Sequence, residues 1–243
     1  MFFYIKNLDT EHIIYGMNTL FMFSNFLFIF LSSFRIHPKK RLFHYLLSHI
    51  SIVSAISYLM LCNDIFTFMV GHKKIYNARY FDWIVNTPVQ LIIIGKIGKL
   101  TDANIYILVL LDIIMILMGW IAELCENQIK WIFFSIGMIV IFPIYKFLFE
   151  DFNFHVVKEF TGDYIATKYY WVGRYLIFLW LFYPIVWILN NVQFNIISNL
   201  TACICYTVLD FLAKVVFVWW IWYCIHHSIY IKTESECNRI SAV

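Results

Sequence analysis

Charged residues are scarce in this chain. Only 14% of its 243 residues are Asp, Glu, Lys or Arg, against 62% hydrophobic and 21% aromatic residues. A soluble globular domain carries about 25% charged residues, so this composition excludes an ordinary soluble protein. The formal net charge of +3 gives no support for nucleic-acid binding, because the basic residues are spread over short loops. The composition predicts an integral membrane protein.

The sequence also lacks repeats, low-complexity tracts and cysteine patterns typical of metal sites. Its six cysteines show no ligand spacing that continues into a second pair, and we predict no metal. Cys62 and Cys125 fall near the same predicted side of the membrane and could form a disulfide. We favour the simpler interpretation that they are small apolar packing residues.

Long apolar stretches dominate what is present, each near the roughly 20 residues that cross a bilayer as a helix. They predict an all-α integral membrane protein, a single seven-transmembrane-helix bundle formed by residues 1–243. The expected spans are residues 12–34, 42–62, 78–98, 103–124, 130–150, 170–190 and 196–226. The sizeable pieces outside them are a loop, Glu150–Tyr170, and the tail after Ser228.

Basic residues alternate between the two ends of these spans, and such residues favour the cytoplasmic side. With the N-terminus outside, the inner side receives Arg35, Lys39, Lys40, Arg41, Lys96, Lys99, Lys146, Lys158, Lys168, Arg174, Lys232 and Arg239. The outer side then receives Lys6, Lys73, Lys74, Arg79 and Lys130. This asymmetry predicts an external N-terminus and a cytoplasmic C-terminus.

Lys214 lies in the middle of the last apolar run, one helical turn after Asp210. A charged side chain at the bilayer centre costs about 2.5–3.5 kcal/mol on insertion scales, so it indicates a functional site. At this spacing the amine and the carboxylate share one helix face, and such a lysine can form a Schiff base with an aldehyde. A purely structural ion pair is the less favoured interpretation, because buried pairs add little stability.

The third span carries polar residues on one helix face: Asp82, Asn86 and Gln90, followed by Ile93. A buried carboxylate needs a cation. We expect Asp82 to be a counterion of Lys214, with Arg79 one turn toward the outside as further compensation. Taken alone, Asp82 could instead be a polar packing residue.

The sixth span places Trp180, Tyr183 and Trp187 on one face, and Pro184 permits a kink. In a chain so rich in aromatics this stripe is compatible with ordinary core packing. Beside a lysine that binds an aldehyde, it would also suit a long conjugated ligand.

These positions resemble the microbial (type 1) rhodopsins, such as bacteriorhodopsin and proteorhodopsin. The matching residues are Arg79, Tyr80, Phe81, Asp82 and Trp83 with Thr87 and Pro88; Trp180 with Tyr183, Pro184 and Trp187; Leu209, Asp210, Ala213 and Lys214; Asp112 and Met115; and, more loosely, Tyr58. Spans one and five match only in character.

The resemblance implies that Lys214 binds all-trans retinal covalently as a protonated Schiff base. It makes Asp82 the main counterion and first proton acceptor, and Asp210 the second counterion, held by hydrogen bonds from Tyr58 and Tyr183. The residues expected around the chromophore are Trp83, Gln90, Asp112, Met115, Trp180 and Trp187.

The chain departs from the pattern of outward proton pumps at three places. Asn86 stands where threonine is usual, and a carboxamide cannot pass a proton as a hydroxyl does. Ile93 stands where a carboxylic donor is usual, so reprotonation should be slow or use another group. The outer half of the seventh span, Asn195–Tyr206, lacks a proton-releasing glutamate.

Gln90 matches blue-absorbing proteorhodopsins and predicts blue to blue-green absorption.

Three modes compete within this family. Asp82, Asp210, Arg79 and Lys214 favour an outward light-driven proton pump, which we prefer, whereas Asn86 and Ile93 favour a slow light-gated channel or a sensory receptor. The expected partners are the lipid bilayer, a transported ion (the proton first) and further copies in a homo-oligomer. The cell membrane and a viral-host membrane both remain open as the location.

Two other classes have less support. A retinal-free structural or chaperone-like relative usually lacks the lysine, and Lys214 is present. A membrane enzyme that uses Lys214 for aldehyde chemistry would need a proton-shuttling group beside an open pocket, and the aromatic lining indicates a permanently bound ligand instead. We therefore expect no enzyme.

Four histidines lie toward the inner ends of spans two and seven: His44, His49, His226 and His227. We favour solvated caps over a switch for these residues.

Overall fold

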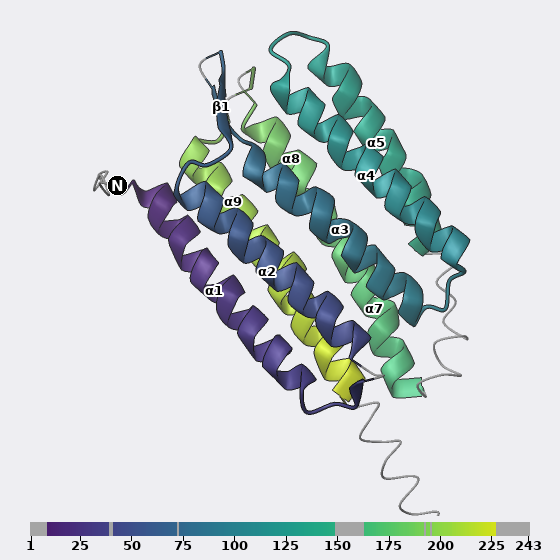
Figure 1. The fold of residues 1–243 in the computed structure, drawn as a ribbon. Coiled ribbons are helices and arrows are strands. Elements are labelled where there is room, and N and C mark those ends of the chain that lie inside the picture. Colours follow the sequence, from purple (N-terminus) through teal and green to yellow (C-terminus); the bar gives the residue numbers. More distant parts are fainter. Residues whose placement is uncertain are drawn as a thin grey trace, which may run out of the picture.

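Tilted, nearly parallel helices form one bundle in the computed structural model, which describes residues 9–38, 41–71, 73–148, 163–191, 193–194 and 196–226 (Figure 1). Residues 150–162 of the predicted loop, the tail after Ser228, His227 and the basic residues Lys6, Lys39, Lys40, Lys158, Lys232 and Arg239 lie outside this description. The helices are α1 (Thr10–Ser33), α2 (Leu42–Cys62), α3 (Asn77–Ile97), α4 (Asp102–Leu124), α5 (Lys130–Lys146), α7 (Asp163–Trp180), α8 (Phe182–Leu189) and α9 (Asn199–Asp210).

Two of the membrane-crossing rods consist of more than one helical piece. The sixth combines α7 and α8, and the seventh runs from α9 to His226. The described part of the chain therefore has seven rods, as predicted. Their bounds agree with the predicted spans within a few residues, except that α7 begins at Asp163 rather than near residue 170.

Local sequence explains where several helices begin. The Thr101 hydroxyl caps α4 by accepting a hydrogen bond from the Asn104 backbone N–H at 3.2 Å. The Ser198 hydroxyl caps α9 in the same way, from the Thr201 N–H at 3.1 Å. Each cap satisfies an amide that lacks a partner within the helix, so each marks the helix start.

The break in the sixth rod lies at Leu181, three residues before Pro184. Proline has no backbone N–H and its ring crowds the preceding turn, so the carbonyl of Trp180 loses its usual partner. The helix is thus interrupted between α7 and α8, near the proline that permits a kink.

The seventh rod contains a π-helical turn, Phe211–Val216, which includes Lys214. The sequence did not predict this turn, because the apolar pattern continues through it unchanged. Wide turns of this kind occur frequently at functional sites and free backbone carbonyls for other partners. Here the Ala213 carbonyl accepts a hydrogen bond from Gln90 Nε2 at 2.7 Å.

A short antiparallel hairpin corrects the all-α prediction in one detail. Strands β1 (Thr67–Val70) and β2 (Lys73–Tyr76) pair in the connection between α2 and α3, with Val70 opposite Lys73. Gly71 in the turn has a φ of +58°, a left-handed conformation that glycine adopts without strain. The hairpin is too short to stand out from the apolar runs around it.

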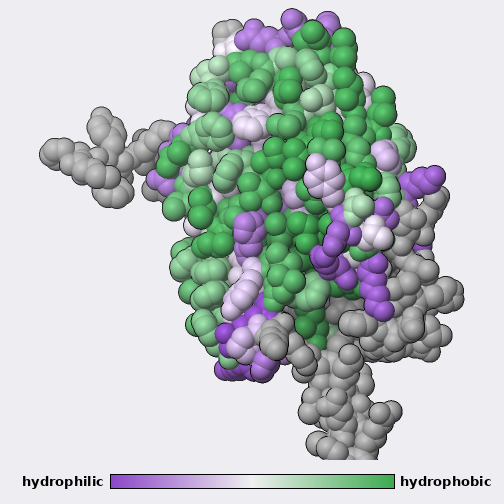
Figure 2. Space-filling view, turned by 45° about the vertical axis from the view of Figure 1, so that its right-hand side comes forward, coloured by the Kyte–Doolittle hydropathy of each residue, from purple (hydrophilic) through white to green (hydrophobic). Residues whose placement is uncertain are grey.

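The exterior of the bundle is apolar, as a membrane protein requires. Figure 2 shows hydrophobic residues over most of one face, with hydrophilic residues gathered mainly toward its ends. Among the described residues, five helical stretches are long and apolar enough to cross a membrane by length and composition: Thr10–Ser33, Leu42–Cys62, Asp102–Leu124, Trp171–Leu189 and Asn199–His226.

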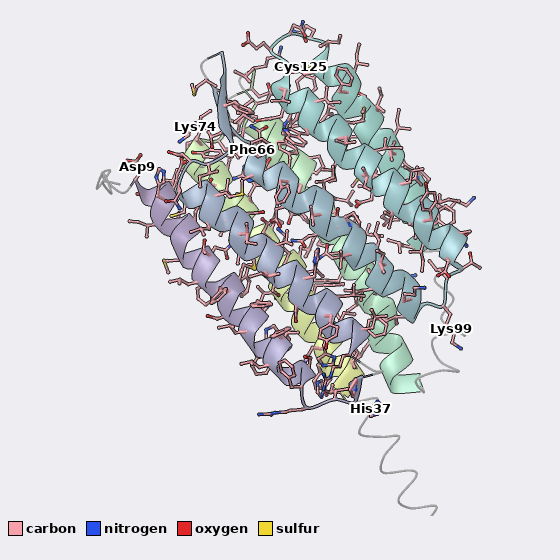
Figure 3. All side chains as sticks on the ribbon, in the orientation of Figure 1. Asp9, His37, Phe66, Lys74, Lys99 and Cys125 are labelled. Atoms are coloured by element: carbon pink, nitrogen blue, oxygen red, sulfur yellow. The ribbon has the colours of Figure 1, made fainter. Side chains whose placement is uncertain are left out.

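The two ends of the bundle carry different segments. Asp9, Lys74 and Cys125 lie at the end that carries β1 and β2, which we call the hairpin end (Figure 3). His37 and Lys99 lie at the opposite end, which we call the His37 end. Lys74 and Lys99, which the predicted topology assigns to opposite sides of the membrane, thus lie at opposite ends of the bundle.

Candidate functional site

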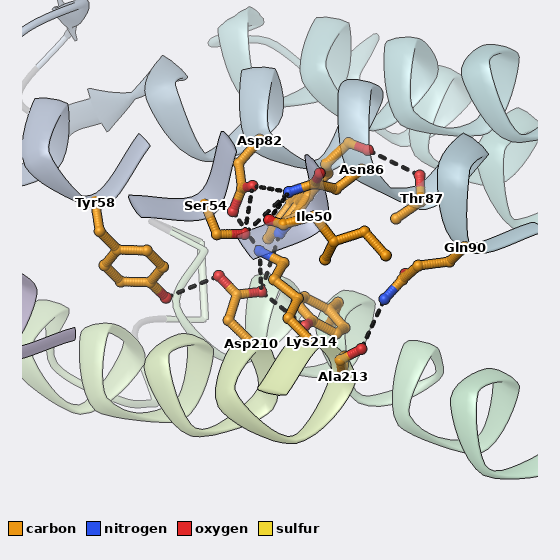
Figure 4. A network of polar contacts seen from close by, with 12 residues as sticks. Ile50, Ser54, Tyr58, Asp82, Asn86, Thr87, Gln90, Asp210, Ala213 and Lys214 are labelled. Carbon is orange, nitrogen blue, oxygen red and sulfur yellow. Dashed lines mark hydrogen bonds and ion pairs between the residues drawn. The ribbon is translucent and has the colours of Figure 1, made fainter. Parts of the chain in front are cut away.

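Lys214 lies at the centre of the bundle between two carboxylates (Figure 4). Its amine donates a short hydrogen bond to Asp82 of α3, and it lies 3.1 Å from Asp210 Oδ1, one turn before it. All three side chains are nearly inaccessible, at 3%, 1% and 1% exposure. Charges this deeply buried persist only when paired and hydrogen-bonded. Asp82 and Asp210 therefore share the Lys214 cation, as predicted.

Asp82 has its own set of donors at the oxygen that does not contact Lys214. Oδ1 accepts hydrogen bonds from Ser54 Oγ at 3.0 Å and from Asn86 Nδ2 at 2.6 Å. The same Asn86 nitrogen lies 2.9 Å from Ser54 Oγ and 3.2 Å from the Ile50 carbonyl. Asn86 therefore joins α2 and α3 beside the ion pair. Ser54 was not identified from the sequence, although its spacing from other α2 serines offered a signal.

Asp210 is held more completely than Asp82. Tyr58 donates to Oδ2 at 2.7 Å, and Tyr183 and Trp83 donate to Oδ1 at 2.8 and 3.3 Å. Three neutral donors together with Lys214 stabilise the carboxylate anion. Asp210 is therefore the more firmly fixed of the two counter-charges.

An apolar cavity of about 120 Å³ extends from Lys214 between α3, α4, α5 and the sixth rod. Its walls are rich in aromatic side chains, and the residues around it include Tyr80, Trp83, Thr87, Gln90, Met115, Ile116, Gly119, Phe134, Gly137, Met138, Ile141, Trp180, Tyr183, Pro184, Trp187 and Tyr206. A Cβ added to Gly119 would meet no atom within 4 Å, so a side chain there would project into free space. A flat apolar ligand with one amine-reactive end fits this cavity.

Asp112 lies on α4 and contacts α3 rather than Lys214. Its Oδ2 is 2.6 Å from Thr87 Oγ1, which is also 2.8 Å from the Trp83 carbonyl. A hydroxyl has one proton, so it cannot donate to both acceptors. The completely buried Asp112 and the Trp83 carbonyl therefore compete for the single proton of the Thr87 hydroxyl.

Arg79 lies one turn from Asp82 toward the hairpin end, but it does not pair with either aspartate among the described ion pairs. Its Nη2 donates to Tyr15 OH at 3.1 Å, and its guanidinium lies 4.2 Å from the centre of the Tyr206 ring. Any compensation of the two aspartates by Arg79 therefore acts across space rather than by direct contact.

A small polar cavity of about 40 Å³ lies beside Arg79 at the hairpin end. Glu123 and Lys73 line it and form an ion pair at 2.9 Å. Toward the His37 end the third helix is different, because Ile93 is completely buried in an apolar cluster with Leu176 and Phe217.

The cysteines in the described part of the chain are free thiols, including Cys62 and Cys125. Cys62 donates instead to the His12 carbonyl, with Sγ 3.4 Å from the oxygen. For Cys62 and Cys125 the structure therefore agrees with the interpretation as packing residues and not with a disulfide.

The chain matches a known protein family over most of its length. A sequence model of the family described as "Bacteriorhodopsin-like protein" matches residues 9–228. The chain belongs to this bacteriorhodopsin-like family. The seven-helix rhodopsin fold and the integral, multi-pass membrane location are thereby confirmed, and the family implies a retinal chromophore.

Relatives of this rhodopsin differ in their named roles. Sensory rhodopsin-1 of Halobacterium salinarum is 27% identical over 191 residues, which is 78% of this chain and 77% of the relative. Opsin-1 of Neurospora crassa is 27% identical over 221 residues, 79% of this chain and 68% of the relative.

Solved structures share the fold of this rhodopsin. The light-driven proton pump Coccomyxa subellipsoidea rhodopsin is 27% identical and superposes with a TM-score of 0.80, covering 87% of this chain and 95% of the pump. The thermophilic rhodopsin from Rubrobacter xylanophilus is 24% identical with a TM-score of 0.81, covering 88% and 96%.

Proposed function

We propose that this rhodopsin is a light-driven proton pump that holds all-trans retinal covalently on Lys214 and moves protons outward, with slow reprotonation. The observation that carries the proposal is the direct contact between the Lys214 amine and Asp82. A proton on Nζ therefore has an acceptor within one hydrogen bond, before any rearrangement of the helices.

The neighbouring side chains decide where that proton goes. Asp210 receives three hydrogen bonds from neutral donors, and these stabilise a negative charge beside Lys214. Asp82 receives two hydrogen bonds from neutral donors and lies closer to Lys214 Nζ than Asp210 does, so it is the proton acceptor. Bound retinal supplies the light absorption and the isomerisation that redirects the N–H at Lys214.

The proposed exit lies toward the hairpin end. The Arg79 guanidinium and the cavity lined by Glu123 and Lys73 continue in that direction from Asp82. Polar groups around a cavity can pass a proton, which a packed apolar core cannot. Following the distribution of basic residues, we place the hairpin end outside and the His37 end in the cytoplasm.

Reprotonation should be the slow step. Ile93 lies on α3 between Asp82 and the His37 end, and it is completely buried among apolar side chains. An isoleucine neither stores nor passes a proton. The proton that returns to Lys214 must therefore come by another route or directly from solution.

The Gln90 amide supports the proposal of blue to blue-green absorption. It is buried at 1% exposure beside the cavity and bonded to the Ala213 carbonyl, which is adjacent to Lys214. A fixed amide dipole near the lysine stabilises a localised positive charge more than a delocalised one, which widens the gap between ground and excited states.

Light-induced current under voltage clamp tests the proposed function. Cells that express the chain with added retinal are illuminated while membrane potential and external pH are varied. Outward current that persists without a driving gradient supports a pump. Current that reverses with the ion gradient, or no current from a coloured protein at the surface, contradicts it.

A light-gated channel is the second candidate, because one specific observation favours it. Buried polar side chains lie on two sides of α2: Asn25 Nδ2 of α1 donates to Ser51 Oγ at 2.8 Å, and Ser54 Oγ donates to Asp82 of α3. Such a polar seam can admit water and ions when helices separate. Reversal of the current in the experiment above would decide for this candidate.

A further inference from the structure

Two histidines that lie 182 residues apart in the sequence meet at the His37 end of the bundle. His44 Nε2 of α2 and His226 Nε2 of the seventh rod are 3.2 Å apart, with the rings at 79°. A nitrogen–nitrogen contact at this distance is a hydrogen bond in which one ring donates and the other accepts. The pair therefore shares a proton, which solvated caps at a membrane boundary would not do.

The two rings have different surroundings. His44 is completely buried, and its Nδ1 has no hydrogen-bond partner among the described residues. His226 is only partly buried and lines a hollow of about 720 Å³ together with Arg35, His37 and Trp222. One ring of the pair thus faces an open hollow and the other faces the interior of the bundle.

The groups around the pair supply no negative counter-charge for an extra proton. The titratable or charged groups near it in the described chain come from three directions: Arg35, His37 and Arg41 from the turn between α1 and α2, Lys168 from α7, and Tyr223 and Cys224 from the seventh rod. In the described chain no carboxylate lies within ion-pair distance of either ring. A neutral pair can pass protons one at a time, but it does not store an extra one.

Hydroxyl groups continue inward from His44 along α2. Ser48, Ser51 and Ser54 follow at one-turn intervals and are buried at 3%, 1% and 0% exposure. Ser48 Oγ has no partner among the described residues, and Ser54 contacts Asp82 beside Lys214. Ten residues of helix span about 15 Å, so this serine face reaches from the histidines to the ion pair. Unpartnered polar atoms in such a row are the kind that ordered water satisfies.

We propose that His44 and His226 form a proton-entry relay that supplies the Lys214 site from the His37 end, in place of a carboxylic acid at position 93. The inference rests on the proposed pump function. A proton binds His226 at Nδ1, the shared proton moves from His226 Nε2 to His44 Nε2, and His44 releases its Nδ1 proton toward Ser48. One proton enters at His226 Nδ1 and one leaves at His44 Nδ1, so the number of protons on the pair is unchanged.

The relay predicts a distinctive pH dependence. Because the pair is neutral at rest, each proton must come from solution, and the rate of proton return to Lys214 should fall about tenfold for each unit of rising pH between pH 6 and 8. A stored internal donor would give a rate that does not change with pH. Flash photolysis of the retinal-bound protein measures this rate as recovery of the visible band.

Variants test the residues themselves. His44→Gln and His226→Gln should each slow the return about tenfold or more, because an amide cannot relay a proton as imidazole does. The double variant should be no slower than either single one, and added imidazole should restore the rate. His49→Gln, on the same helix but without a histidine partner, is the matched control and should leave the rate unchanged.

A second measurement does not depend on retinal. Imidazole ¹⁵N NMR of the retinal-free protein should show one protonated and one bare Nε2 in the pair, and His226→Gln should shift the His44 signals but not those of His49. Independent signals, a pH-independent rate, or rates within about twofold of the parent in both glutamine variants overturn the relay. If the parent never loses the Lys214 proton in light, the pump proposal itself fails, and the relay fails with it.

Discussion

The two halves of the bundle on either side of Lys214 are built from different kinds of residue. Toward the hairpin end, Arg79, Tyr15 and Tyr206 surround a polar cavity that Glu123 also lines. Toward the His37 end, Ile93 closes the third helix within an apolar cluster. The two regions thus differ in whether polar groups or apolar side chains surround the third helix.

This difference explains how one buried ion pair can direct a proton. Lys214 and its two carboxylates have similar burial, so burial alone gives no direction. Direction comes from what lies beyond them: polar groups on one side, and on the other an apolar barrier bypassed only by the serine face of α2. The following predictions break or sharpen this contrast, from the largest expected effect to the smallest.

Lys214 lies where the two halves of the bundle meet, and the first change removes its amine. Lys214→Ala should abolish the visible absorption band after addition of retinal, because no other primary amine in the described chain lines the cavity. Absorption spectroscopy of the purified protein measures this. Lys96→Ala, an exposed lysine at the His37 end, is the control and should keep the band. A coloured Lys214→Ala protein would refute the assignment.

The second change neutralises Asp82, the first proton acceptor on the proposed route toward the hairpin end. Asp82→Asn should move the band to longer wavelength at neutral pH, because less negative charge stabilises the cation. It should also slow proton loss from Lys214 by about 10²–10⁴-fold, the usual worth of a positioned base. Asp112→Asn, which does not contact Lys214, should change both far less. An unchanged band would move the counterion role to Asp210.

Placing a carboxylic acid in the apolar barrier makes the two halves more alike. Ile93→Asp should speed proton return to Lys214 by about 10²-fold, and the rate should lose its dependence on pH, because a stored proton replaces one from solution. Ile93→Asn has nearly the same shape without a titratable group and should not accelerate. Equal rates in the two variants would show that hydration alone sets the rate.

Removing the amide next to the lysine should change colour more than transport. Gln90→Leu deletes the hydrogen bond to the Ala213 carbonyl and the dipole beside Lys214. We expect a band at longer wavelength with the acceptor chemistry at Asp82 intact. The absorption maximum and the proton-loss rate are measured on the same sample. A shift to shorter wavelength would reverse the proposed effect of the dipole.

A change at the rim of the hairpin end should matter least. Asp64 pairs with Lys74 at 2.5 Å and with His12 at 3.3 Å, but the Lys74 side chain is 33% exposed. Partly exposed pairs contribute about 0.2–1 kcal/mol, so Asp64→Asn should lower the free energy of unfolding by no more than this. Thermal loss of the visible band measures the change. A loss of several kcal/mol would make the rim part of the structural core.

The sequence by itself determined the features that follow from helix geometry and composition. Apolar runs of membrane length placed the seven rods, and the four-residue spacing of Asp210 and Lys214 put them on one face because a helix turns every 3.6 residues. The pairing of Lys214 with Asp82 also followed, since a buried cation must have a buried anion.

Only the tertiary structure decided the contacts between distant segments. Ser54 bonds Asp82, Arg79 rests on Tyr206 instead of an aspartate, and His44 meets His226, because these pairs depend on how rods rotate and tilt against one another. The π-helical turn at Lys214 also escaped prediction, since an apolar run reads the same in either helical form. Periodicity fixes which face a residue occupies, whereas packing decides which partner that face meets.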